Sequence, residues 1–218
     1  SSRFIKNAVS KFRRKFLLSI STFEADMINF FDENNNFIKP AISDNFSAGK
    51  YLSILANTFG AKYIIPFSSH HEYQREDSMW VNDYIYPLEK YSKDIDKRHT
   101  FIKPFSFINS KKDDDFSSLN INKKKLEVKP PELFGDNWKD ELSANDKNII
   151  QNYFDKFLSF KNKLGFLSFI VGGKEFNLKF SGPNKKGISF ELPRNSLITA
   201  CKHKVFDDLL IANFMKTK

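Results

Sequence analysis

The sequence has little cysteine and no long apolar run, and both absences exclude classes of protein. Its 218 residues include one cysteine, Cys201, which excludes an internal disulfide framework and a cysteine-based zinc cluster. This cysteine usage fits a reducing compartment, so we expect a cytoplasmic protein. No apolar run reaches the roughly 18 residues that a membrane span needs, and we predict no transmembrane segment. Basic and apolar residues alternate at the start of the chain, unlike a signal peptide.

The sequence also lacks a concentrated basic surface and the common two-histidine metal motifs. It contains neither HxH nor HExxH. The formal net charge of +9 is spread over lysine-rich turns, whereas a nucleic-acid interface gathers basic residues on one face. Only residues 3–15 approach such a cluster. We therefore predict no nucleic-acid partner and a solvated basic surface.

The chain contains many apolar residues, a large share of them aromatic, that can form a hydrophobic core. Hydrophobic residues make up 40% of the sequence, and 25 of the residues are phenylalanine. A chain of this length and composition is not disordered and can form one large domain or two small ones. It shows no internal repeat and no low-complexity tract.

The first segment has the period of an amphipathic helix. Residues 3–18 carry apolar side chains at helical spacing, with lysine and arginine on the other faces. A basic amphipathic helix can lie on a membrane surface. We favour the alternative, a helix packed on a sheet with its basic side facing water.

Both ends of the chain look truncated. We therefore expect that the chain is part of a larger protein.

Residues 26–39, DMINFFDENNNFIK, predict a strand, a turn and a short extended piece. The strand is expected at Met27–Phe31, and the asparagines that follow tolerate left-handed turn geometry. Asp26 and Asp32 flank this strand. Either carboxylate could reach a site at the end of a strand, but we favour Asp32 as the cap of the turn.

The following residues predict a helix and then a buried strand. Residues 47–59 form the helix, with Ser47 as its N-cap and Gly60 as its stop. The apolar run Tyr63–Ile65 is typical of a strand covered on both faces. Strand, helix and strand in this order predict an α/β fold, in which helices cover a sheet.

The rest of the chain predicts a connector and a small α+β unit. In residues 93–142, polar runs surround short apolar pieces, which indicates a connector with one or two strands. Ser143 and Asp146 open a helix, and FLSFIVGGKEFNLKF predicts a β-hairpin that turns at Gly172–Gly173. A strand at residues 187–192 and two further helices complete this unit.

The stretch YIIPFSSHHEYQREDSMWVNDY, Tyr63–Tyr84, gathers ligand-type side chains directly behind a strand. Loops beyond the carboxyl ends of strands collect ligands in α/β folds. Histidine is the commonest metal ligand and titrates near neutral pH. Consecutive side chains in extended chain point opposite ways, so one of His70 and His71 would be a ligand and the other a contact to substrate. From the residues alone, a solvated polar loop is the alternative.

Other side chains of this stretch are candidate substrate contacts. They are Ser68, Ser69, Tyr73, Arg75 and Trp80. The planar guanidinium of Arg75 suits a phosphate or carboxylate, and the alternative is a salt bridge with a neighbouring acidic residue. Trp80 is alternatively a core residue. Outside the stretch, His99 and His203 are isolated, and Cys201 is expected to be a small buried apolar residue.

The order of elements in residues 24–71 resembles the C-terminal half of a metallo-β-lactamase-fold domain. The segments that carry the resemblance are ADMINFFDENNNFIKP and LANTFGAKYIIPFSSHHEYQ. They match the family's run of strand, loop, helix, Gly-Ala-Lys-like turn and strand, which ends in Ile-Pro and a metal-binding histidine. The form is similar to the branch that includes sugar-lactone hydrolases and CMP-sialic acid hydroxylase-like proteins. The match covers about a quarter of the chain.

The resemblance implies an αββα layered fold and metal-dependent hydrolysis of an ester, lactone or phosphoester bond. The cofactor would be a divalent metal, zinc first and iron or manganese as alternatives. The partner would be a small-molecule substrate, and an anionic substrate is one of the options. Only the last metal histidine carries over, with His71 preferred to His70. The family's His-x-His-x-Asp-His motif is absent, and it would precede Ser1. The spacing from Pro66 to the histidine is also longer than usual in the family.

Three domains and three functions follow as predictions. Residues 1–92 would be the C-terminal half of the metallo-β-lactamase-like domain, residues 93–142 the connector, and residues 143–218 a small α+β domain similar to sterol-carrier-like domains. That last domain could provide an apolar cleft or dimerisation, so a homo-oligomer is possible. Oxygenation or hydroxylation on the same fold is the second function, and a non-enzymatic binding module is the third.

Overall fold

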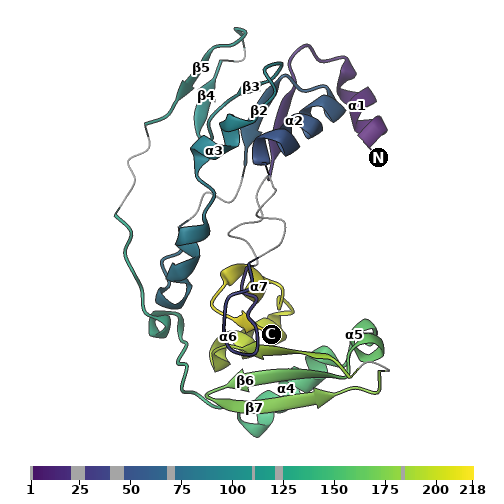
Figure 1. Ribbon diagram of the computed structural model, residues 1–218, viewed down its shortest axis with the longest axis vertical. Coiled ribbons are helices and arrows are strands. Elements are labelled where there is room, and N and C mark those ends of the chain that lie inside the picture. The colour runs from purple at the N-terminus through teal and green to yellow at the C-terminus, as the bar shows by residue number, and fades with distance from the viewer. Residues whose placement is uncertain are drawn as a thin grey trace. The chain divides into compact units, whose positions relative to one another are not determined.

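The structure is a computed structural model, and it describes residues 2–20, 28–39, 47–67, 72–109, 111–120, 125–182 and 185–218 (Figure 1). The described residues are mixed in secondary structure, with 37% in helices and 21% in strands. It divides into two compact units. Unit 1 comprises Ser1–Ala25, Ala41–Glu72 and Tyr84–Leu126, and unit 2 comprises Asp26–Pro40, Tyr73–Asp83 and Glu127–Lys218. Each unit therefore combines segments that are distant in sequence, whereas the predicted domains are consecutive ranges.

Unit 1 is built on a small parallel sheet. Strands β1 (Phe16–Ser19), β2 (Tyr63–Pro66) and β3 (Thr100–Phe101) lie in the order β1-β2-β3, and both pairs are parallel. Strand β2 is central, and its Ile64 is fully buried. Parallel strands need a crossover connection, and helix α2 (Ala48–Phe59) lies in the chain between β1 and β2. These helices and sheets agree with the predicted α/β class, while the specific layered fold remains a prediction.

Helix α2 has the predicted boundaries because both ends are capped. The Ser47 side chain accepts a hydrogen bond from the Lys50 N–H, and Gly60 adopts a left-handed conformation with φ of 68°. The buried face of the helix, with Leu52 and Ala56, packs near Ile64 and Tyr91 in the core of unit 1. This core fixes the helix against the central strand.

The remaining elements of unit 1 are short. They are α1 (Ser2–Ser10), α3 (Leu88–Lys93), β4 (Ser106–Ile108) and β5 (Phe116–Ser118), and β4 and β5 form an antiparallel pair. The prediction of one helix over residues 3–18 is wrong beyond Ser10, because Phe16–Ser19 pairs with β2 instead. Tertiary pairing here overrides the local helical period. In the described part of the chain, no helix is long and apolar enough to cross a membrane.

Unit 2 contains a four-stranded sheet in the order β7-β6-β8-β9. The strands are β6 (Phe166–Val171), β7 (Lys174–Lys179), β8 (Gly187–Glu191) and β9 (Lys216–Thr217). The hairpin from β6 to β7 turns at Gly172 and Gly173 as predicted, with φ of 59° and 73°. Both values lie in the region that favours glycine. Strand β8 runs parallel to β6.

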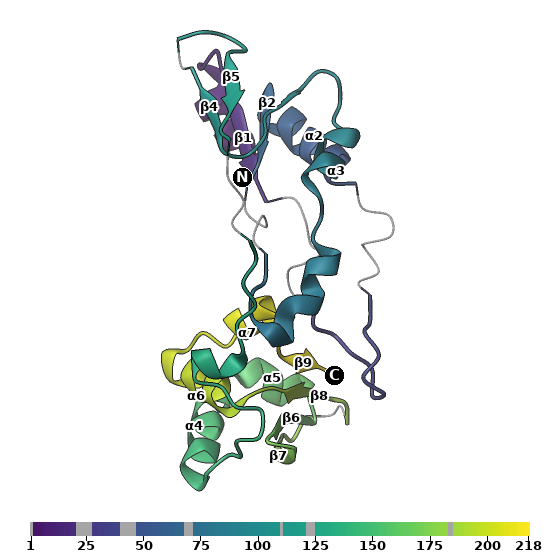
Figure 2. The ribbon, with the colours of Figure 1, turned by 90° about the vertical axis from the view of Figure 1, so that its left-hand side faces the viewer.

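Helices cover one face of this sheet and build the larger core. They are α4 (Ala144–Phe154), α6 (Arg194–His203) and the shorter α5 (Leu158–Lys163) and α7 (Asp208–Ala212) (Figures 1 and 2). Alternate residues of β6, namely Leu167, Phe169 and Val171, belong to the buried cluster that α4 and α6 complete. Residues Phe166 and Ser168 therefore belong to the opposite face of the sheet.

Residues 28–39 belong to unit 2 and form no named strand. Phe30 bridges Thr217, and Phe31 bridges Phe37 across the predicted turn. The Asp32 carboxylate accepts hydrogen bonds from the Asn34 and Asn36 N–H groups, so Asp32 caps the turn. The expected strand Met27–Phe31 is wrong as a strand of the layer around β2, because β2 pairs with β1 and β3, while Phe30 and Phe31 form isolated bridges elsewhere. Met27 and Asp26 lie outside the described residues.

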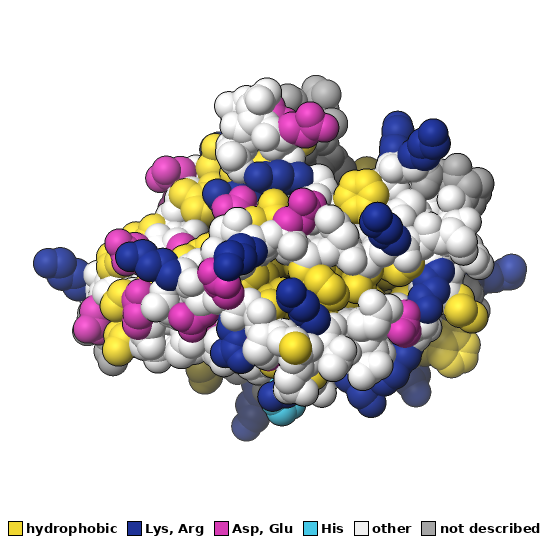
Figure 3. Space-filling view, turned by 90° about the horizontal axis from the view of Figure 1, so that it is seen from below, with side chains coloured by type: hydrophobic (Ala, Val, Ile, Leu, Met, Phe, Trp, Pro, Cys, Tyr) yellow, Lys and Arg dark blue, Asp and Glu magenta, His cyan; other side chains and the backbone are white. Residues whose placement is uncertain are grey.

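The basic side chains are dispersed on the face that Figure 3 presents. Lysine and arginine side chains lie around exposed hydrophobic side chains over the whole view, and aspartate and glutamate lie among them mainly on its left and in its centre. This distribution agrees with the predicted solvated basic surface on that face.

Candidate functional site

The carboxyl end of β2 is the candidate site that the sequence predicts. Strand β2 ends at Pro66 in the centre of the parallel sheet, and β1 ends beside it at Ser19. The two strands therefore leave the sheet at the same edge, where α/β folds collect ligands. The predicted residues Ser68, Ser69, His70 and His71 follow β2 in the sequence. They lie outside the described residues, so their roles remain predictions.

The other predicted site residues lie in unit 2. The boundary between the units falls between Glu72 and Tyr73, within the stretch Tyr63–Tyr84 that the sequence predicts as one site. Tyr73 and Arg75 are thus positioned by elements of the second unit. Residues 74–76 pair with Lys129, through hydrogen bonds from the Lys129 N–H to the Gln74 carbonyl and from the Glu76 N–H to the Lys129 carbonyl.

Tyr73 is anchored by both its backbone and its hydroxyl group. Its N–H donates to the Asn82 side-chain oxygen over 2.8 Å, and the Asn82 amide donates back to the Tyr73 carbonyl over 2.9 Å. The hydroxyl donates to the Ile211 carbonyl and accepts from the Asn213 amide, each over 3.0 Å. These contacts give Tyr73 a structural role in joining the segment to the end of the chain.

Arg75 lies in a buried cluster of charges and aromatic rings. Its side chain is 12% exposed. Nε and Nη2 donate to the two Asp77 oxygens over 2.7 and 3.0 Å, and Nη1 donates to Asp136 Oδ2 over 2.7 Å. The guanidinium carbon lies 3.9 Å from the centre of the Phe214 ring and 5.6 Å from that of Phe134. Both distances are in the range of cation–π attraction.

The electrostatics of this cluster hold Arg75 as a cation. Burial lowers the pKa of Arg75, but the hydrogen bonds that it donates to the Asp77 and Asp136 carboxylates outweigh this effect and raise the pKa above its ordinary value. Its two carboxylate partners compensate the buried charge. The salt bridge to Asp77 is one of the alternatives that the sequence indicates. The second carboxylate, Asp136, lies 61 residues away in the sequence, so no local pattern predicts this salt bridge.

Asp136 connects the cluster to the start of α6. Its side chain is fully buried. Its Oδ1 accepts the Ser196 N–H over 2.8 Å, and its Oδ2 accepts the Ser196 hydroxyl over 2.5 Å. The Trp138 indole N–H donates to Asp77 over 2.8 Å. Every carboxylate oxygen of the cluster is thus engaged, which indicates a structural centre.

A pocket of about 490 Å³ adjoins this cluster, and we call it the aromatic pocket. It is lined by aromatic rings and a few polar groups: Phe31, Asp77, Trp80, Trp138, Glu191, Asn213, Phe214 and Lys216. Trp80 also packs edge-to-face with Phe31 and Phe37, at centroid distances of 5.7 and 5.4 Å. Trp80 is therefore part of an aromatic cluster and also lines the pocket, and its contact with substrate stays a prediction.

The polar groups of the aromatic pocket already have partners. Asp77 is engaged by Arg75 and Trp138. Glu191 lies 3.6 Å from the Lys216 ammonium, and the Asn213 amide oxygen accepts the Ile28 N–H over 3.0 Å. The pocket can hold an apolar group, but its hydrogen-bonding groups are committed to the fold.

The described residues alone do not fit a metal centre. Among them, no group of three or more His, Cys, Asp or Glu side chains could hold a metal ion. His99 places Nδ1 3.0 Å from the Ala61 carbonyl oxygen, and His203 lies in the last turn of α6. Burial raises the pKa of Cys201 to about 12, so its thiol is a poor nucleophile.

Comparisons with known proteins leave the family open. No protein-family model, curated protein or solved structure matches this chain.

Proposed function

We propose that this chain belongs to a metal-dependent hydrolase of the metallo-β-lactamase fold, which acts on an ester, lactone or phosphoester bond. The observation that carries the proposal is the position of β2. This strand lies centrally in a parallel sheet, is connected through α2, and ends at Pro66 shortly before His70 and His71 in the sequence. Histidine beyond the carboxyl end of such a strand suits a ligand site.

The proposed roles follow the sequence resemblance. His71 is one metal ligand, and His70 is the alternative ligand or a substrate contact. A bound divalent metal, zinc or otherwise iron or manganese, supplies an activated water for attack on the scissile bond. Because the described residues hold no sufficient ligand set, the proposal requires ligands from outside these residues.

Two of the predicted substrate contacts, Arg75 and Tyr73, already have hydrogen-bond partners within the fold. Arg75 is occupied by Asp77 and Asp136, and the Tyr73 hydroxyl is occupied by the end of the chain. The proposal therefore rests on neither of them as an anchor for an anionic substrate. Ser68 and Ser69, which precede the histidines, remain the proposed contacts.

A hydrolysis assay on the full-length protein tests the proposal. Chromogenic ester, lactone and phosphodiester substrates should be hydrolysed in a chelator-sensitive way, with activity restored by added zinc. His71→Ala should lower kcat by about 100-fold or more, because loss of a ligand weakens the metal and its activated water. His203→Ala, at the exposed end of α6, is the matched control and should leave the rate unchanged. Equal rates in all three proteins would overturn the assignment.

An oxygenase on the same fold remains the alternative enzyme. It would consume dioxygen with an iron-loaded protein and leave the hydrolysis substrates intact. A non-enzymatic binding module is the third candidate, and the pocket of about 490 Å³ between aromatic side chains in unit 2 favours it. If the protein is such a binding module, replacing both His70 and His71 should leave its ligand binding unchanged.

A further inference from the structure

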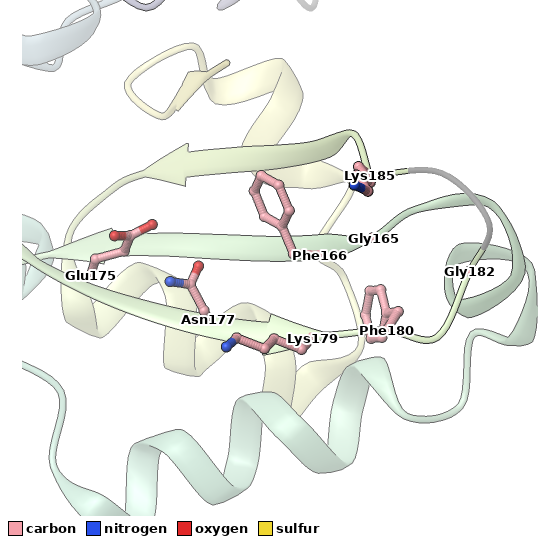
Figure 4. A pocket seen from close by; sticks show the side chains of 8 residues that line it. All are labelled: Gly165, Phe166, Glu175, Asn177, Lys179, Phe180, Gly182 and Lys185. Atoms are coloured by element: carbon pink, nitrogen blue, oxygen red, sulfur yellow. The ribbon is translucent and has the colours of Figure 1, made fainter.

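The face of the unit 2 sheet opposite the helices holds a second pocket, of about 440 Å³, which we call the sheet-face pocket. It lies over β6 and β7 and the ends of the adjoining segments (Figure 4). Its lining residues are Gly165, Phe166, Glu175, Asn177, Lys179, Phe180, Gly182 and Lys185. None of them belongs to the site proposed for hydrolysis. The volume is within the range of small-molecule sites.

An aromatic ring with a fixed position forms one wall of this pocket. A Cβ atom added to Gly187 would lie 2.5–2.6 Å from three carbons of the Phe166 ring. The ring therefore packs against the backbone of β8, the neighbouring strand in which Phe166 is paired with Gly187. Glycine permits this close cross-strand contact. A ring held in this way can offer its other side to a planar ligand without losing further conformational freedom.

The end of the pocket is fixed by backbone contacts. The Gly165 N–H donates to the Lys186 carbonyl, and the Phe180 N–H donates to the Gly165 carbonyl, each over 2.8 Å. A Cβ atom at Gly182 would lie 2.6 Å from the Leu164 carbonyl oxygen. The segment after β7 thus passes too close to Leu164 for any side chain at Gly182, which holds the pocket's end in place.

The polar groups on β7 point to the same side as the Phe166 ring (Figure 4). Ser168, which is fully buried, donates to Glu175 Oε1 over 2.7 Å and so orients this carboxylate. Within the described residues, the other Glu175 oxygen and the Asn177 amide have no hydrogen-bond partner. These groups contrast with the committed polar groups of the aromatic pocket.

Two cations complete the lining. Lys179 and Lys185 are exposed, and neither has an ion pair or hydrogen bond within the part of the chain that the structure describes. Glu175 is the only carboxylate among the lining residues. Two ammonium groups near one site suit a doubly charged anion such as a phosphate monoester.

We propose that the sheet-face pocket binds a nucleoside monophosphate or a similar small compound that joins a planar ring to a phosphate. The ring stacks on Phe166, Asn177 and Glu175 hydrogen-bond its polar edge, and Lys179 and Lys185 contact the phosphate. Asn and Glu side chains are suited to this edge, because an amide pairs with a ring nitrogen and an amino group, and a carboxylate accepts from an amino group.

Isothermal titration of the 218-residue chain tests this site with adenosine 5′-monophosphate, adenosine and inorganic phosphate as probes. We expect the monophosphate to bind at least about tenfold more tightly than either part alone, and its affinity to fall with added salt. Lys179→Ala with Lys185→Ala should weaken binding by about tenfold or more. The control pair Lys156→Ala with Lys202→Ala makes the same charge change at exposed lysines outside the pocket and should bind normally.

The outcomes separate the parts of the proposal. Failure of the monophosphate to bind the folded chain overturns it. Equal affinity in the two lysine pairs shows that any binding is general attraction to a basic protein and also overturns it. If adenosine binds as tightly as the monophosphate, the phosphate site does not exist. If single-stranded RNA binds stoichiometrically and with far higher affinity than the monophosphate, the ligand is a polymer instead. Circular dichroism of the variants, all at exposed lysines, verifies that they fold.

Discussion

At the scale of single residues, the Arg75 side chain connects segments that are distant in the sequence. It joins a 3₁₀ helix (Glu76–Tyr84) through Asp77, the region before α4 through Asp136, and two aromatic rings. Asp136 is fully buried and depends on this cation for charge compensation. Removing one partner of a buried pair leaves an uncompensated charge, which costs more than the pair contributes.

We predict that Arg75→Met lowers the free energy of unfolding by about 3–5 kcal/mol, as expected for breaking a buried ion pair. Arg75→Lys should lose less, because it keeps the charge but not the paired hydrogen bonds. Urea denaturation measures both. The control is Arg98→Met, whose side chain is 69% exposed and pairs with Asp96, and it should leave the stability nearly unchanged because the ion pair is screened by solvent. Equal losses at the two arginines would contradict the structural role of Arg75.

At the scale of elements, the contact of β6 with β8 depends on a glycine. Gly187→Ala places a Cβ atom 2.5 Å from the Phe166 ring, and we expect a loss of about 1–3 kcal/mol in unfolding free energy from overpacking. In a Phe166→Ala background, the same change should cost little. A double-mutant cycle by urea denaturation measures this coupling. Additive effects would show that the ring does not pack on Gly187.

Helix α4 should make the chain sensitive to acid through its capping box. Burial raises the pKa of Asp146, but hydrogen bonds from Arg194 and Ser143 outweigh this effect and hold the pKa below its ordinary value. A carboxyl group whose folded pKa is lowered stabilises the fold above its unfolded pKa, and this contribution is lost as pH falls through the folded pKa.

We therefore predict that Asp146→Asn lowers the unfolding free energy by about 1–2 kcal/mol near neutral pH, and that this difference shrinks toward zero as the pH falls through the lowered folded pKa of Asp146. Denaturation at a series of pH values measures the difference. A difference that stays constant across the series would contradict the account.

The elements that sequence reasoning found are those whose signals are local. The caps of α2, the capping box of α4 and the glycine turn of β6–β7 each lie within a few residues. Strand β1 was missed because its pairing with β2 depends on residues about 47 positions away. Residues 28–39 likewise contact Thr217, which no local period can reveal.

The candidate site divides in the same way. A strand ending before the histidines could be predicted from the apolar run Tyr63–Ile65, and β2 (Tyr63–Pro66) lies there. The partners of Arg75 could be predicted only in part, because Asp77 is adjacent in sequence and Asp136 is not. The lining of the sheet-face pocket follows from the pairing of strands, and no single motif in the sequence indicates it.

At the scale of the whole molecule, the two units have cores of different size. Among the described residues, six buried side chains form the cluster of unit 1 and sixteen that of unit 2. Separate cores can open in separate cooperative steps. Leu52 and Leu197 are both fully buried, one in each cluster, and provide a matched pair of Leu→Ala changes.

We predict that Leu52→Ala speeds amide hydrogen exchange in α2 and β1–β3, while β6–β8 keep their protection. Leu197→Ala should speed exchange in β6–β8. Each change should cost about 2–5 kcal/mol within its own unit, and peptide-resolved mass spectrometry reads the exchange. Uniform acceleration over the whole chain after Leu52→Ala would show one cooperative unit instead.

The metal content of the purified full-length protein tests the proposed hydrolase most directly. Elemental analysis should find a bound divalent metal, its amount reduced at least about tenfold by His71→Ala or by His70→Ala, and unchanged by His203→Ala. The account predicts a loss confined to the histidines that follow β2. Unchanged metal content in both of these variants, or no metal in the unaltered protein, would contradict it.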